Sequence, residues 1–81
     1  MNTYTTEFFA KCPNNGVRIK YTLCIETTRT LSVEDVVTAV ETFKEGYHEL
    51  IADELIARFG GQQTLTADHH SVTIQTIRSA A

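Results

Sequence analysis

The stretch from Leu31 to Gly61 constrains the fold most, because it is the only segment long enough to close over a core. Its apolar residues recur at steps of three and four, which places them on one face of an amphipathic helix. They are Val33, Val36, Val37, Val40, Phe43, Tyr47, Leu50, Ile51 and Leu55. Ser32 precedes this run and can cap its free amides, and Gly60 follows it in the position where a left-handed residue often ends a helix. The sequence therefore predicts helix between residues 31 and 61.

Gly46 leaves the continuity of this helix open. A glycine costs roughly 1 kcal/mol against alanine inside a helix and is common at kinks. The apolar spacing runs from Val36 through Phe43 to Leu50 without a change of phase, which favours a single helix of about 42 Å. The alternatives are thus one long helix, which the spacing favours, and a helix broken at Gly46.

Two predicted hairpins flank the helical stretch. Residues 4–12 and 17–28 form the first, since the Asn-Gly pair between them is a strong hairpin signal. In its second strand, apolar odd positions from Val17 to Ile25 alternate with polar even positions, so the odd ones face a core. Residues 62–68 and 71–78 form the second hairpin, with Val72 and Ile74 pointing inward.

This order of elements predicts a single α+β domain over residues 1–81, a two-layer sandwich. Its antiparallel four-stranded sheet (ββαββ) carries one long or Gly-broken helix packed on one face. The predicted core comprises Ile19, Tyr21, Leu23, Ile25, Val36, Val40, Phe43, Leu50, Val72 and Ile74. Phe8 and Phe9 cannot both reach this core from a regular strand, so we predict that they contribute to a self-association surface.

The composition is that of a globular protein, with 42% hydrophobic and 21% charged residues. No apolar run approaches the roughly 20 residues that span a membrane, and the N-terminus lacks the basic and apolar regions of a secretory signal. We therefore predict a cytoplasmic protein with no membrane segment. A chain of 81 residues buries only about 60% of its unfolded surface, so a homo-oligomer is expected.

Charge is distributed unevenly along the chain, whose formal net charge is −3. Seven of the ten acidic residues lie between Leu31 and Gly61, against Lys44 and Arg58. Overall acidity disfavours direct nucleic-acid binding, which depends on neutralising phosphates. The acidic surface is either only solvated or a docking site for a basic partner protein, which could itself bind nucleic acid. The residues predicted to bind this partner are Glu41, Glu45, Glu49 and Asp53.

Asp68, His69 and His70 are the residue types that bind zinc or nickel. Adjacent turn residues rarely aim at one ion, and a closed site would need two further ligands. The candidates for these are His48, Cys12 and Cys24. We therefore predict no metal site and no cofactor.

No catalytic motif frames a nucleophile in this sequence. Cys12 and Cys24 lack the CxxC spacing and are predicted to be reduced, structural thiols. His48 beside Glu49 is interpreted as an exposed polar pair rather than a general base. No catalytic residue is assigned from the sequence.

If the helix breaks at Gly46, the order of elements resembles a half-unit of the tunnelling fold of pterin and folate enzymes. In that fold, two strands, two helices and two strands assemble into barrels between subunits. The resemblance implies a small enzyme with its active site at a subunit interface. The zinc-binding histidine pattern of that family is absent, because neither of the first two predicted strands contains histidine.

From the residues themselves, we predict a small non-enzymatic interaction protein in the cytoplasm, acting as an inhibitor or adaptor. It would self-associate and bind its partner protein through the acidic helix. The alternative is the small tunnelling-fold-like enzyme.

Overall fold

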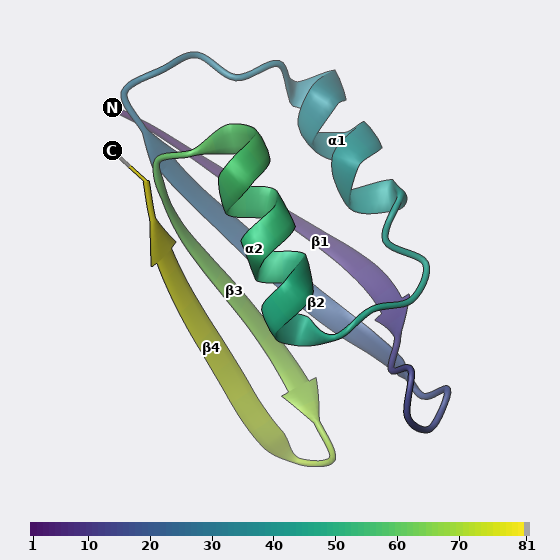
Figure 1. Cartoon of the computed structure of the whole chain (residues 1–81). Helices are drawn as coiled ribbons and strands as arrows, with labels where there is room; N and C mark the ends of the chain where they lie inside the picture. Colours follow the sequence, from purple (N-terminus) through teal and green to yellow (C-terminus); the bar gives the residue numbers. More distant parts are fainter. Residues whose placement is uncertain (81) are drawn as a thin grey trace.

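The computed structural model describes residues 1–80, and Ala81 lies outside this description. The elements in chain order are β1 (Asn2–Lys11), β2 (Arg18–Thr27), α1 (Val33–Glu41), α2 (His48–Phe59), β3 (Gln62–His69) and β4 (Val72–Ser79) (Figure 1). The predicted α+β fold with an antiparallel four-stranded sheet is therefore confirmed.

The strands follow one another across the sheet in chain order, and each pair is antiparallel. Both helices lie on the same face of the sheet, α1 over β1 and α2 over β3 and β4 (Figure 1). The register places Tyr21 opposite Phe8 on one side and Ala67 on the other. Within residues 1–80, β1 and β4 each have a hydrogen-bonded neighbour on one side only.

The helical stretch is divided into two helices, so the favoured single helix is wrong and the Gly-broken alternative is found. Residues 42–47 leave helical conformation, and this connection is tied to the end of β1. The Lys11 amide donates to the Lys44 carbonyl at 3.0 Å, and the Gly46 amide donates to the Lys11 carbonyl at 3.1 Å. After this break α2 starts in a new phase, which leaves Leu50 59% exposed instead of in the core.

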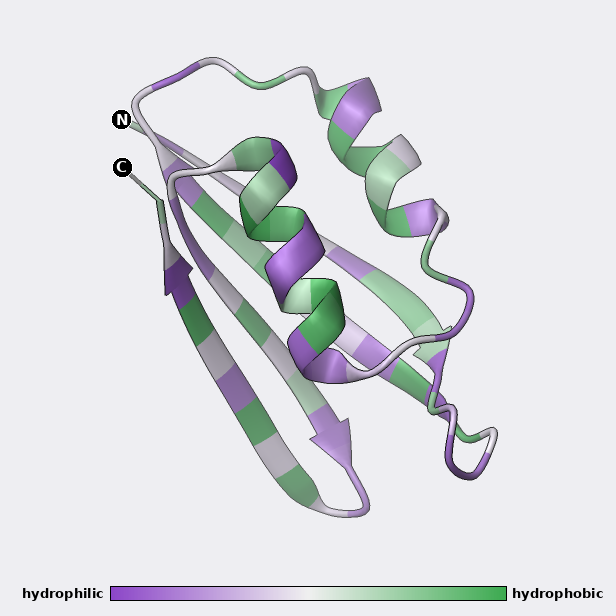
Figure 2. Cartoon of the chain, in the orientation of Figure 1, coloured by the Kyte–Doolittle hydropathy of each residue, from purple (hydrophilic) through white to green (hydrophobic). Residues whose placement is uncertain are grey.

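Most of the predicted core is confirmed: Ile19, Tyr21, Leu23, Ile25, Val36 and Val40 are buried. Phe43 packs at the margin of the core, and Ile74 is half-buried. Val72 is 61% exposed, contrary to the prediction, because the tip of the β3–β4 hairpin extends past the start of α2 (Figure 1). Figure 2 shows hydrophobic and hydrophilic residues alternating along the strands, as expected for a sheet with one covered face.

Both predicted helix ends are confirmed. The Asp35 amide donates to Ser32 Oγ at 3.3 Å, and Gly60 has a φ of 66° after α2. The buried side chain of Gln63 makes two further hydrogen bonds there, which the sequence did not suggest. Its side-chain amide donates to the carbonyls of Leu55 and Gly60 at 3.0 and 2.9 Å, which satisfies acceptors at the end of α2.

No helix in the described part of the chain has the length and apolar character needed to cross a membrane.

Candidate functional site

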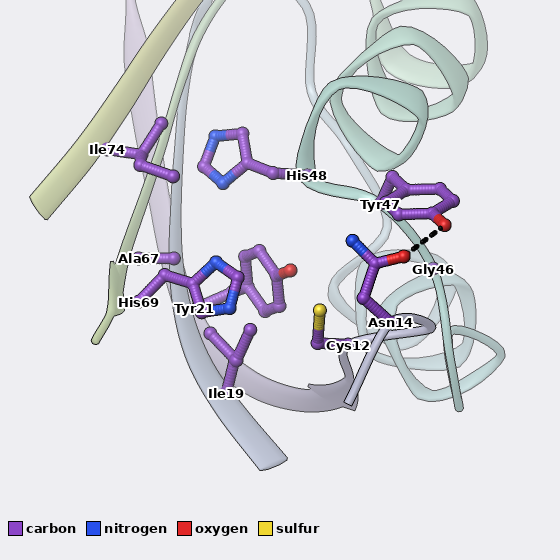
Figure 3. A pocket seen from close by; sticks show the side chains of 10 residues that line it. All are labelled: Cys12, Asn14, Ile19, Tyr21, Gly46, Tyr47, His48, Ala67, His69 and Ile74. Atoms are coloured by element: carbon purple, nitrogen blue, oxygen red, sulfur yellow. Dashed lines mark hydrogen bonds between the residues drawn. The ribbon is translucent and has the colours of Figure 1, made fainter. Parts of the chain in front are cut away.

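A cavity of about 140 Å³ lies between the sheet and the start of α2 (Figure 3). It is found at the end of the molecule where the β1–β2 loop, the α1–α2 connection and the β3–β4 turn meet. Its lining residues are Cys12, Asn14, Ile19, Tyr21, Gly46, Tyr47, His48, Ala67, His69 and Ile74.

Strand alternation explains why several of these side chains converge. Ile19 and Tyr21 are two apart in β2, and Ala67 and His69 are two apart in β3, so all four point to the helix-covered face. The pairing of Tyr21 with Ala67 sets the two strands in register. His48 is the first residue of α2 and enters the cavity from above the sheet (Figure 3).

Two histidines of the lining have buried ring nitrogens. Both nitrogens of His48 and Nε2 of His69 lack a hydrogen bond of good geometry within residues 1–80, although the Leu65 backbone interacts with the His48 ring. A buried polar atom without a partner costs about 1–3 kcal/mol. Because native proteins satisfy nearly all such atoms, their concentration here makes this cavity the candidate site.

The lining of the cavity is mostly apolar and contains few ionisable groups. Burial lowers the pKa of His48, although the neighbouring Glu49 carboxylate and a hydrogen bond to the Leu65 backbone oppose this shift. Burial raises the pKa of Tyr21, and Cys12 adds to this shift. The His48 ring packs on Tyr21, with ring centroids 5.6 Å apart. Apart from the two histidines, none of the described lining residues is of an ionised type such as Asp, Glu, Lys or Arg.

The loops around the cavity are held to one another by side chains. The Tyr47 hydroxyl donates to Asn14 Oδ1 at 2.9 Å, and the Asn15 amide nitrogen lies 2.9 Å from His70 Nε2. His70 and Ser71 both adopt positive φ, at 53° and 68°. Such values suit glycine or asparagine better, so this tight turn stores strain beside the cavity.

The four acids predicted to bind a partner do not lie on one helix. Glu41 ends α1, Glu45 is in the connection, and Glu49 and Asp53 are in α2. The Arg78 guanidinium pairs with Glu49 at 2.7 Å and with Asp53 at 3.1 Å. Two of the four carboxylates thus already have a cation from β4, and a partner-binding role for the set remains a prediction.

The two phenylalanines predicted for self-association lie on opposite faces. Phe8 is buried and stacks on Tyr21 with centroids 5.1 Å apart, so it belongs to the core. Phe9 is 47% exposed on the outer face, with the Arg18 guanidinium carbon 4.0 Å from its ring centroid. Of these two residues, Phe9 is the one exposed enough to contact another copy of the chain.

The histidine turn does not form a metal cluster. Asp68 accepts from the Thr73 hydroxyl at 2.6 Å, while His69 turns into the cavity and His70 faces the β1–β2 loop. Within residues 1–80 no group of three or more His, Cys, Asp or Glu side chains is placed to hold an ion. The absence of a metal requirement therefore stays a prediction.

Both cysteines are free, and strand alternation puts them on different sides of the sheet. Cys12 is buried and lines the cavity, whereas Cys24 is half-buried on the outer face. Figure 3 shows the Cys12 side chain pointing into the group formed by Tyr21, Asn14 and His69. Sequence reasoning missed this cavity because its polar members come from two strands, a helix start and a loop that are far apart in the chain.

The fold of this chain is similar to that of a solved structure. No family model matches the chain, and no curated protein matches it. Among solved structures, it is similar to the crystal structure of archaeosine synthase QueF-Like in the apo form. The similarity covers 99% of this chain and 93% of that chain, with a TM-score of 0.78 at 15% identity. This likeness shows the fold. The two-helix order is also the one on which the resemblance to a tunnelling-fold half-unit depends.

Proposed function

We propose that this chain is the subunit of a small, self-associating enzyme of the tunnelling-fold type, acting on a small molecule held in the cavity. The observation that carries this proposal is the gathering of two histidines with buried ring nitrogens and a free thiol around one cavity. The similar solved chain is named as a synthase, which favours an enzyme over a non-enzymatic inhibitor or adaptor. Fold likeness at this identity supports the proposal but does not carry it.

Cys12 is the nucleophile in this proposal. Its thiol gives a proton to a cavity imidazole, and the sulfur forms a bond to an electrophilic carbon of the substrate. The electron pair displaced from that carbon goes to the attached heteroatom, which takes the proton from the imidazolium. Neutral His48 is suited to this role, because burial lowers its pKa and leaves a nitrogen lone pair available at neutral pH.

Alkylation of the thiols tests this assignment, with the second cysteine as a matched control. In a Cys24→Ser chain, iodoacetamide should modify Cys12 under native conditions. Because imidazole assistance is typically worth a factor of about 100 or more, the rate should fall clearly in His48→Phe. In a Cys12→Ser chain, modification of Cys24 should be insensitive to that change. Modification of Cys12 only as fast as the whole protein unfolds would contradict a catalytic role.

Self-association in this proposal occurs head to tail through the two edges of the sheet. With four strands in alternating directions, β4 of one copy can pair antiparallel with β1 of the next without breaking the alternation. Exposed apolar side chains lie along both edges: Phe9 and Val37 on the β1 side and Ile77 on β4. Pairing would cover these side chains and remove both free edges.

Sedimentation equilibrium of Phe9→Ser and Leu50→Ser distinguishes specific pairing of the sheet edges from non-specific association. Both residues are large, apolar and about half exposed, but Leu50 lies on α2 away from its buried side. We expect the native chain to form oligomers, Phe9→Ser to weaken them and Leu50→Ser to leave them unchanged. A native chain that stays monomeric at high concentration would overturn the self-association.

A further inference from the structure

We propose that Asn15 is a site of self-modification, at which the side-chain amide is lost and the residue becomes aspartate or isoaspartate. The backbone nitrogen of Gly16 is the nucleophile, and the His70 ring supplies a proton to the departing ammonia. The modification takes place in the loop between β1 and β2 and is independent of the function proposed for the cavity.

The residue that follows Asn15 favours this reaction. Of the three asparagines in the chain, Asn2, Asn14 and Asn15, the last is the one followed by glycine. The backbone nitrogen of the next residue must reach the side-chain Cγ to close a succinimide ring, and a Cβ on that residue hinders the approach. Gly16 has no Cβ, and nothing lies within 4 Å of the place where one would be. Asn15 therefore has the least hindered nucleophile of the three.

Two hydrogen bonds fix the orientation of the Asn15 amide. Its Oδ1 accepts from the Val17 amide at 3.0 Å, and its Nδ2 lies 2.9 Å from His70 Nε2. An amide nitrogen only donates, so the neutral imidazole accepts through Nε2. A half-turn of the amide would set two donors against each other at Val17. The oxygen and the nitrogen that change charge during the reaction therefore each face a group that can assist them.

The reaction needs water as its only co-reactant. The Gly16 nitrogen loses its proton to solvent and bonds to Cγ of Asn15, and the carbonyl electron pair moves onto Oδ1, where the Val17 N–H stabilises it. When the carbonyl re-forms, the Cγ–Nδ2 bond breaks and its electron pair stays on the nitrogen. That nitrogen takes a proton from the His70 imidazolium and leaves as ammonia. The ring regains its proton from solvent, and water then opens the succinimide at either carbonyl.

One hydrogen bond of the loop opposes the attack. The Gly16 amide donates to the Cys12 carbonyl at 2.8 Å, which retains the proton that must leave. Residues 14–17 are all exposed, so this bond can open locally while the core stays folded. The rate is therefore set by loop opening as well as by the chemistry, and the modification accompanies ageing of the protein.

The product changes both charge and backbone beside the cavity. Aspartate at position 15 still accepts from Val17 and adds a carboxylate next to the His70 ring. Isoaspartate also lengthens the main chain by one methylene group directly after Asn14, whose Oδ1 accepts from the Tyr47 hydroxyl at 2.9 Å. Modification would therefore disturb the contact that ties this loop to the start of α2.

Incubation of the native protein at neutral pH in water labelled with heavy oxygen tests the site, because hydrolysis of the succinimide incorporates the label. Peptide mass spectrometry follows Asn2, Asn14 and Asn15 in the same chain. We expect Asn15 to convert at least about tenfold faster than the other two, since it alone combines an unhindered nucleophile with a proton donor. Conversion of Asn15 no faster than that of Asn14 overturns the proposal.

Variants at position 70 test the proton transfer. His70→Phe has no proton to give, and His70→Gln offers an acceptor for Nδ2 but no acidic proton. Both should slow conversion of Asn15 in the folded protein by about tenfold, less than the factor of about 100 or more typical of a fully protonated general acid. In denaturing urea, both variants and the native chain should react equally, because the contact with His70 is lost. A native rate in either folded variant, or a faster one, would show that His70 only holds or protects the amide and would overturn its role.

Gly16→Ala tests the nucleophile independently of His70. The added methyl group should slow conversion of Asn15 both in the folded protein and in urea, because it hinders the attacking nitrogen in either state. Circular dichroism verifies that each variant is folded before incubation. An unchanged rate in urea would exclude attack by the backbone nitrogen of residue 16 and overturn the succinimide route.

Discussion

At the scale of single residues, burial of the His48 imidazole costs folding free energy, and the same imidazole is available for the proposed function. Its ring packs on Tyr21 in the core, yet its buried nitrogens have no hydrogen-bond partner of good geometry, only an interaction with the Leu65 backbone. An apolar residue at this position would fill the same space without that cost. An imidazole here therefore suits the proposed binding role better than a purely structural one.

The same burial predicts a pH dependence of stability. Burial lowers the pKa of folded His48 below its ordinary value of 6.5. Below that value the unfolded chain binds more protons than the folded chain, so stability is complete above it and falls as the pH decreases. The urea midpoint should therefore decrease between about pH 7.5 and about pH 5.5.

The matched variants for this prediction are His48→Phe and His70→Asn. The Glu49 carboxylate and the Leu65 backbone favour the protonated form of His48, and Arg78 disfavours it. The first variant should flatten the pH dependence and the second should preserve it. An equal slope in both would assign the effect to groups other than His48.

Leu23 tests the assignment of the sheet faces at a single position. It is 1% exposed at the centre of β2, so Leu23→Ala should reduce the free energy of unfolding by about 2–5 kcal/mol. Thr22→Ala on the opposite face is the control and should change it by less than about 0.5 kcal/mol. Chemical denaturation measures both, and similar losses would mean that the two faces are equally packed.

At the scale of elements, the strands and the helix ends could be predicted because their signals are local. Alternation in β2, the hydroxyl of Ser32 and the glycine at position 60 each act within a few residues. The break between α1 and α2 could not, because it depends on hydrogen bonds between residues 44 and 46 and the distant Lys11. The continuous apolar phase across Gly46 was coincidental, and it placed Leu50 wrongly in the core.

The junction of α2 and β3 gives a prediction on glycine. Gly61 has a φ of 70°, and an added Cβ would lie 2.5 Å from the Glu26 carbonyl oxygen. Gly61→Ala should therefore destabilise by more than the roughly 1 kcal/mol that the left-handed conformation alone costs. Gly16 has the same φ but nothing within 4 Å of such a Cβ, so Gly16→Ala isolates the conformational cost.

Thermal denaturation of these two glycine variants measures the difference. Gly61→Ala should have the lower melting temperature. Equal melting temperatures would show that β2 moves away from the added methyl group without cost.

At the scale of the whole molecule, the candidate site depends on the tertiary fold and not on any local sequence pattern. Cys12, His48 and His69 each have an unremarkable local context: the residue after a strand, a helix start and a strand end. Only the order of the strands and the position of α2 bring them to one cavity. A pattern confined to neighbouring residues cannot contain that information, which is why His48 was interpreted as exposed.

The effect of a chelator on thermal stability is also a property of the whole molecule. Residues 1–80 form a packed core and include no group of three or more His, Cys, Asp or Glu side chains placed to hold an ion, so we expect EDTA to leave the melting temperature of untagged protein unchanged. A clear decrease would contradict the predicted independence of metal.

The two chain ends lie at the same end of the molecule, where Met1 and Ala80 line one shallow surface depression (Figure 1). In the proposed head-to-tail pairing, the end of β4 in one copy lies beside the start of β1 in the next. A short linker could therefore join two copies covalently without a change of topology. Such a fusion would turn an intermolecular contact into an intramolecular one, which raises its effective concentration. Duplication of the coding sequence in tandem would be a direct evolutionary route from this small chain to a two-unit protein, whose halves could then diverge.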